Sequence, residues 1–170
     1  IVLIGCFHED DEKKSQFSVT SSQHYAVVST QASDYSSGDF AIVSLEDYTI
    51  DTNNFGTGSD SVISTYNSYI YQISRFGRDS ITRFYLSALE GEQKQFSTDN
   101  VQDEKSNPYK LVVKDDTTAY LLRYGTDKIW VVNPLADTID LFKTGEIDLS
   151  NYSGADGIPE TTDALLIDNK

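Results

Sequence analysis

Short apolar runs separated by polar turns recur along most of this chain. Runs begin at residues 62, 111 and 165, at intervals of 49 and 54 residues. Asn- or Asp-rich segments typical of hairpin turns follow the first two runs, and further apolar runs come next at residues 69–73 and 119–122. No long segment keeps an apolar period of 3.6 residues, so the pattern predicts an all-β fold.

One turn sequence occurs twice. Residues 75–81 and 123–129 both contain Arg, an aromatic residue, Gly, Asp and Ile in the same order, 48 residues apart. Each copy lies between two apolar runs, so we interpret both as turns that join a second strand to a third. We expect Gly77 and Gly125 to have a positive φ or to permit a close backbone approach.

A repeat of 20–50 residues is typical of propellers and other arrays. Four short antiparallel strands in each repeat predict the blades of a β-propeller. An earlier unit is indicated by strands at residues 25–28 and 39–43, an edge strand is predicted at 138–142, and residues 165–167 would begin another unit. Residues 24–170 are therefore predicted to form an incomplete β-propeller of about two full blades plus partial ones, because four to eight blades need about 180–360 residues.

Composition and charge restrict the class of partner. The 170 residues are 38% hydrophobic and 24% charged, which is typical of a globular domain. The formal net charge is −14, which would repel a phosphate backbone, so nucleic acid is not an expected partner.

The first residues resemble a bacterial processing signal. Residues 3–6, Leu-Ile-Gly-Cys, match the lipobox that ends a lipoprotein signal peptide, and a charged segment follows directly. The resemblance implies that residues 1–5 are the tail of a signal peptide. Residues 6–23 would be a flexible tether that begins with a lipidated Cys6. The alternative is that residues 1–5 form a buried first strand and Cys6 is a small core residue.

The second turn also carries a family resemblance. Residues 123–129 are followed by the apolar strand 130–132 and then by Asn133 and Pro134. This order resembles the blades of extracytoplasmic YVTN/YncE-like β-propeller proteins, over residues 24–170. The resemblance implies an extracytoplasmic propeller of the bacterial cell envelope, and together with the lipobox it implies a lipid anchor on the outer-membrane or periplasmic side.

The sequence offers little material for catalysis. His8 and His24 are the only histidines, and no phosphate loop, Gly-x-Ser-x-Gly or Cys-x-x-Cys motif occurs. We therefore predict no catalytic residue, no metal and no cofactor. An acidic loop at residues 156–163 could hold calcium, but its spacing fits no standard calcium loop and favours a solvated loop.

Arg75 and Arg123 are the candidate ligand contacts. If the two turns are equivalent, both guanidinium groups could face the central channel of a propeller and bind an anionic ligand. The alternative is that each arginine pairs within its own turn, with Asp79 or with Asp127.

Two functions from different classes follow. The first is a lipid-anchored binding scaffold that recognises a protein, a peptide or another envelope component. The alternative is part of a propeller enzyme, such as a quinoprotein-like oxidoreductase or a lactonase-like hydrolase, with its active site in other blades. The propeller fold hosts both classes, so the fold alone does not separate them.

Overall fold

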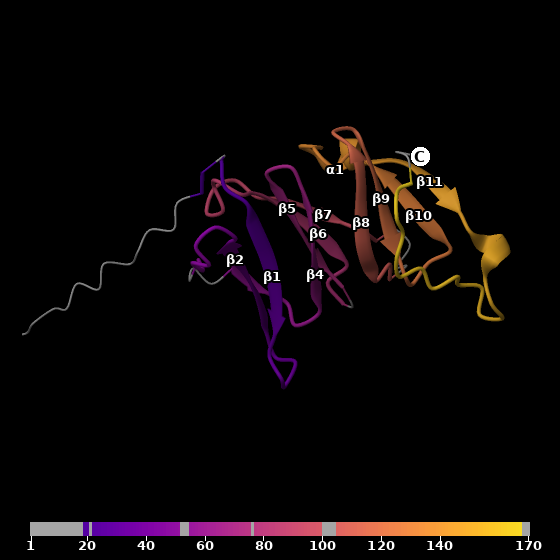
Figure 1. The fold of residues 1–170 in the computed structure, drawn as a ribbon. Coiled ribbons are helices and arrows are strands. Elements are labelled where there is room, and N and C mark those ends of the chain that lie inside the picture. The colour runs from indigo at the N-terminus through magenta and orange to yellow at the C-terminus, as the bar shows by residue number, and fades with distance from the viewer. Residues whose placement is uncertain (1–18, 21, 52–54, 76, 100–104, 168–170) are drawn as a thin grey trace, which may run out of the picture.

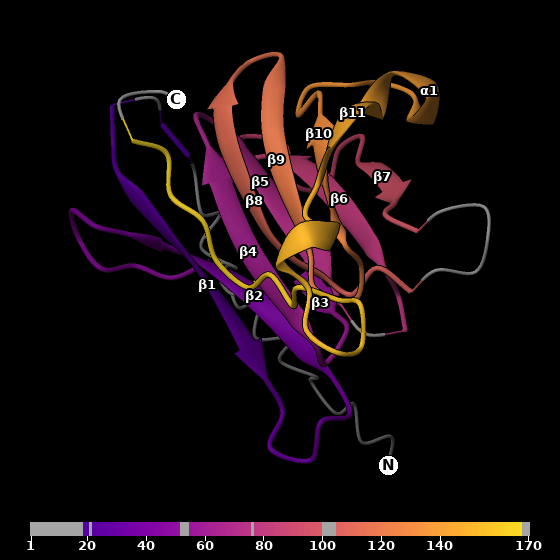
Figure 2. The same cartoon turned by 90° about the vertical axis from the view of Figure 1, so that its right-hand side faces the viewer.

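The computed structural model describes residues 19–167 except 21, 52–54, 76 and 100–104. In this part of the chain eleven strands form three antiparallel sheets, which follow one another along an arc (Figure 1). Viewed from the side, the sheets lie face to face (Figure 2). These are the blades of a partial β-propeller, as the sequence predicted.

Each blade is a meander in which neighbours in sequence pair with one another. The first blade contains β1 (Tyr25–Gln31), β2 (Gly38–Ser44) and β3 (Phe55–Thr57). The second blade contains β4 (Ser61–Tyr66), β5 (Tyr69–Ser74), β6 (Ser80–Tyr85) and β7 (Lys94–Ser97). The third blade contains β8 (Pro108–Asp115), β9 (Thr118–Arg123), β10 (Lys128–Val132) and β11 (Lys143–Asp148).

Two predicted strands are wrong. Residues 138–142 contain a short helix, α1 (Ile139–Phe142), and the edge strand of the third blade is β11. The helix turns Phe142 inward, where its ring stacks on Phe96 with the centroids 4.5 Å apart. Residues 165–167 form no strand: they pair with no strand in the described part of the chain, and Leu165 is 79% exposed. A short 3₁₀ helix, η1 (Ser150–Tyr152), follows β11.

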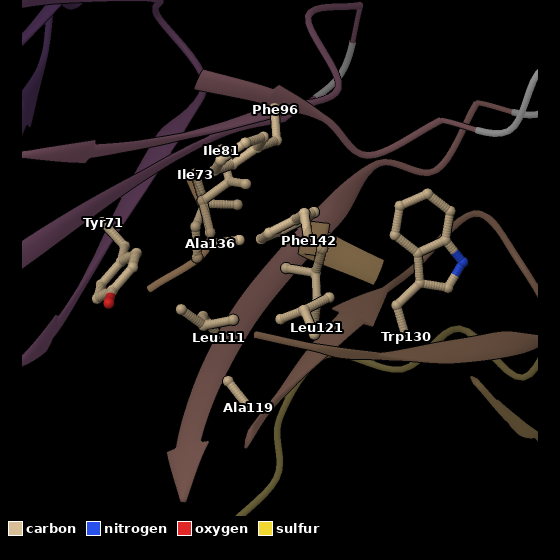
Figure 3. Packing of buried hydrophobic residues seen from close by; sticks show 11 residues of the cluster. Tyr71, Ile73, Ile81, Phe96, Leu111, Ala119, Leu121, Trp130, Ala136 and Phe142 are labelled. Atoms are coloured by element: carbon tan, nitrogen blue, oxygen red, sulfur yellow. The ribbon is translucent and has the colours of Figure 1, made fainter. Parts of the chain in front are cut away.

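The larger core lies between the second and third blades. Figure 3 shows its side chains facing one another, with Phe142 in the middle of the group. Burial of these side chains removes apolar surface from water and holds the two sheets together. The cluster consists of Tyr71, Ile73, Ile81, Phe96, Leu111, Ala119, Leu121, Trp130, Val132, Ala136 and Phe142.

A smaller core lies between the first and second blades. The ring of Phe40 stacks on Phe55 at 4.8 Å and meets the edge of Phe84 at 5.3 Å. Ile42 and Ile70 complete the centre of this group, and Leu89 is buried with them. This core occupies only part of the space between the two sheets.

The strands of the first blade correspond to the last three strands of the others. The Leu45 N–H donates to the carbonyl of His24, just before β1, and the Leu86 N–H donates in the same way to Ser68, just before β5. β1 is therefore equivalent to β5, as the sequence predicted for residues 25–28. The described residues of the first blade contain no equivalent of β4 and β8.

No helix in the described residues is long and apolar enough to cross a membrane.

Candidate functional site

The sequence-predicted site residues fall in different environments. Cys6 lies outside the described residues. Arg75 donates from Nε to the Asp60 carboxylate at 2.8 Å, and its guanidinium lies 4.3 Å from the Tyr109 ring centroid. The predicted alternative partner, Asp79, does not take this ion pair.

Arg123 is fully buried between the second and third blades. Its Nε donates to the carbonyl of Thr98 at 3.1 Å, and its guanidinium lies 4.2 Å from the Trp130 ring centroid. The cation over the indole face and the bond to a backbone carbonyl compensate for loss of water around the charge. Binding of an anionic ligand by Arg75 or Arg123 stays a prediction.

The two arginines are not in equivalent positions. The backbone N–H of Arg75 donates to Asp60 before β4, and the corresponding bond in the third blade is made by Tyr124, which donates to Asn107 before β8. The turn between β9 and β10, residues 124–127, is one residue shorter than residues 75–79 between β5 and β6. Side chains alternate between the faces of a strand, so Arg75 and Arg123 lie on opposite faces of their blades. The structural counterpart of Arg123 is Ser74.

The two turn glycines confirm the backbone prediction for different reasons. Gly77 has a φ of 83°. A Cβ atom on Gly125 would lie 2.4 Å from the carbonyl oxygen of Lys105, so this glycine permits a close approach of two backbone segments.

A polar cleft of about 820 Å³ lies between the first and second blades. The first blade contributes Phe55 and Gly56 on one side, and side chains of β5, β6 and β7 line the opposite side. The lining from the second blade comprises Gln72, Ser74, Arg78, Ser80, Thr82, Phe84, Gln93, Gln95 and Ser97.

In the sheet of the second blade, polar side chains form two rows that run across the strands. One row is the set of paired serines on its four strands, Ser61, Ser74, Ser80 and Ser97. The adjacent row pairs Gln72 with Thr82 and Thr82 with Gln95. Within this second row, Gln95 Nε2 donates to the Thr82 hydroxyl at 3.2 Å.

The cleft is deep at β5 and open at β7. Gln72 is 8% exposed, Ser74 3% and Thr82 6%, whereas Gln95 and Ser97 are exposed. Polar groups at this depth lose contact with bulk water and need partners inside the cleft. The deep end therefore presents hydrogen-bonding groups to whatever occupies it.

The interface between the second and third blades is packed instead, because larger or apolar side chains occupy the equivalent positions. There the three positions equivalent to Gln72, Ser74 and Thr82 are Leu121, Arg123 and Trp130, as the strand pairings establish. Large side chains close one interface, and small or uncharged polar side chains leave the other open.

The cleft carries little charge. Arg78 is the one charged residue of its described lining, which has no carboxylate and no histidine. Arg78 reaches over Gly58, where a Cβ atom would lie 2.9 Å from its Nε. Nowhere in the described residues do three or more His, Cys, Asp or Glu side chains gather where they could hold a metal ion.

The acidic loop near the end of the chain is engaged with the third blade. The Glu160 carboxylate accepts a hydrogen bond from Tyr124 Oη at 2.9 Å, and this bond raises the pKa of the tyrosine. Asp163 pairs with Lys110, which lowers the pKa of the aspartate. These contacts attach the loop to the blade through ordinary surface pairs.

Sequence reasoning missed the cleft. The available signal was the alternation of Gln72 and Ser74 with apolar residues in β5, and of Ser80 and Thr82 with Ile81 in β6. Alternation of this kind normally predicts a face in contact with solvent. Only the position of the first blade shows that these side chains face another sheet.

Comparisons with known proteins show distant likeness. Neither a protein-family model nor a curated protein matches this sequence. One similar solved structure is a catalytically inactive virginiamycin B lyase from Staphylococcus aureus with quinupristin, at 10% identity and a TM-score of 0.46. Another is a streptogramin B lyase, at 14% identity and a TM-score of 0.41. Each alignment covers 74% of this chain, which spans 46% and 45% of the two lyase chains.

Proposed function

We propose that this protein is a binding scaffold of the bacterial cell envelope and that it holds its ligand in the cleft between the first and second blades. The single observation that carries the proposal is that the second blade has polar residues, two of them much smaller, at the positions equivalent to Leu121, Arg123 and Trp130 of the third blade. The partner is an envelope component, a peptide or a segment of a protein, and nucleic acid is disfavoured by the net charge of −14.

The chemistry of the cleft supports binding more than catalysis. Hydroxyl and amide side chains orient a ligand through hydrogen bonds, but they are neither acids nor bases near neutral pH. The deep groups Gln72, Ser74 and Thr82 lie on regular strands of a paired sheet, so the site is held rigidly before a ligand arrives.

The test is ligand retention by the purified protein. We expect native mass spectrometry, after incubation with a polar extract of bacterial envelopes, to show at least one retained species. The variant Ser74→Arg, which introduces the side chain found at the equivalent position of the third blade, should lose it. A matched substitution on the exposed loop, Thr162→Arg, should retain it.

Two results would contradict the scaffold proposal. Retention of the same species by wild type and by Ser74→Arg would remove the cleft as the site. Chemical conversion of the retained species would favour the enzyme alternative instead.

Lipid anchoring at Cys6 is a separate part of the proposal, supported by residues 3–6 and the polar segment behind them. We expect the mature amino terminus of the protein expressed in a bacterium to be Cys6 with attached acyl chains, because several chains are needed for stable anchoring. Mass spectrometry of the terminal peptide measures this directly. The variant Cys6→Ser should remain unprocessed, and an unmodified thiol in the wild type would refute the anchor.

A further inference from the structure

We propose that the ligand of the cleft is a neutral saccharide. This inference rests on the proposed binding function and names the chemical class of its ligand. It is carried by the hydrogen-bonding character of the deep side chains, by the near absence of charge in the lining and by the aromatic residues at one end.

The deep side chains match a polyhydroxylated molecule. In the described part of the structure, the carbonyl oxygen of Gln72 has no hydrogen-bond partner, and its amide nitrogen makes only a long contact, 3.4 Å, with the Ser74 hydroxyl. No partner is found there for the Ser80 hydroxyl either. Each serine or threonine hydroxyl both donates and accepts, and sugar hydroxyls do the same, so a saccharide can satisfy both rows at once. Gln72 is 8% exposed and Ser80 is half-buried, so both groups are open to a ligand while reaching little bulk solvent.

The charge of the cleft excludes strongly ionic ligands. A cation would find no carboxylate in the described lining. A polyanion would find only Arg78, at the rim, within a chain whose net charge is −14. Burial of a charge without a partner costs more free energy than the neutral hydrogen bonds of the site supply, so the lining favours an uncharged ligand over a cation or a polyanion.

One end of the cleft is apolar and aromatic. Phe84 lines it while 6% exposed, and Phe55 lines it with one ring face covered by Phe40. A pyranose ring has an apolar face of C–H groups that packs on aromatic rings, and its hydroxyls project from its edge. The aromatic end and the hydroxyl rows therefore fit the two sides of the same ligand.

The volume is suitable for such a ligand. About 820 Å³ is within the range of about 300–1,000 Å³ that small-molecule sites occupy. The exposed residues at the β7 end, Gln93, Gln95 and Ser97, give access from solvent, so an oligosaccharide could enter with one end leading.

The experiment measures binding of defined neutral saccharides. Maltotriose, cellotriose and chitotriose are tested by saturation-transfer difference NMR, followed by calorimetry for any that bind, with trialanine as a peptide control. We expect at least one saccharide to bind the wild type. The variants Gln72→Leu and Thr82→Val keep the size of the side chain but remove its hydrogen-bonding groups, and each should weaken binding by about tenfold.

Controls separate loss of the site from loss of the fold. Thr162→Val removes a hydroxyl from the exposed loop and should bind like the wild type. Circular dichroism melting curves must show that both cleft variants are folded. Equal saccharide binding by wild type and by folded cleft variants would overturn the inference.

Failure of the inference differs from failure of the proposed function. If no saccharide binds but the wild type still retains an envelope species that Ser74→Arg loses, the saccharide inference is overturned and the binding function stands. If neither a saccharide nor an envelope species is retained, both are overturned.

Discussion

Gly77 and Gly125 lie in turns of similar sequence but serve different physical purposes. Gly77 has a left-handed backbone with open space where a Cβ atom would lie, whereas Gly125 lies directly against the backbone that enters β8. The sequence predicted that both positions need glycine. It did not distinguish the two reasons, because the contact with Lys105 depends on how a distant segment folds back.

Alanine substitution separates the two requirements. We expect Gly77→Ala to lower the free energy of unfolding by about 1 kcal/mol, the cost of a left-handed backbone for a residue with a side chain. Gly125→Ala should cost more, about 2–3 kcal/mol, because backbone must move to admit the Cβ atom. Urea denaturation measures both. Equal costs would contradict the close approach at Gly125.

Tyr71 provides a test of burial through pH. Its hydroxyl donates to the carbonyl of Pro134 at 3.2 Å, and burial raises its pKa well above the usual range. The unfolded chain ionises this tyrosine near pH 10 and the folded chain does not, so its contribution to stability is present below pH 10 and is lost as the pH rises further.

We therefore expect Tyr71→Phe to cost about 1 kcal/mol at pH 7, through loss of the hydrogen bond. The difference between wild type and variant should shrink at pH 11. Chemical denaturation at the two pH values gives the comparison, and Tyr152→Phe, at a position 79% exposed, is the control. A difference that grows with pH would contradict the buried neutral hydroxyl.

At the scale of elements, the positions of the strands could be predicted from the sequence, but the face of the blade on which each side chain lies could not. The apolar runs placed β4, β5, β8 and β9 correctly, since short runs between turn residues are a local signal. The repeat match aligned Arg75 with Arg123, but a turn shorter by one residue moved the match to the other face of the blade. Side chains alternate between the two faces of a strand, so a shift of one residue places a side chain against the blade on the other side.

The corrected alignment predicts unequal costs at equivalent positions. Leu121→Ala should lower the free energy of unfolding by about 2–4 kcal/mol, because it leaves a cavity in the packed interface. Gln72→Ala should cost less than about 1 kcal/mol, because its side chain borders space that is already open. Thermal and urea unfolding of both variants measure the contrast. A larger cost at Gln72 would mean that the cleft is closed in solution.

At the scale of the whole molecule, three blades form an arc with two unlike interfaces. Repetition predicted the blades, because each unit carries its own strands and turns. The cleft was not predictable in the same way, because it arises from the side chains of one sheet and the position of its neighbour. The candidate ligand site thus depends on a difference between repeats, whereas the fold depends on their similarity.

The unlike interfaces have a consequence for how the protein opens. The second and third blades share the large core, so their strands should unfold as one cooperative unit. The first blade is held by the smaller aromatic group and is joined to β4 by only residues 58–60. We expect native-state amide hydrogen exchange to be faster in β1 and β2 than in β5 and β9, through local opening of the first blade. A ligand in the cleft would contact both units, and its binding should slow exchange in the first blade most strongly.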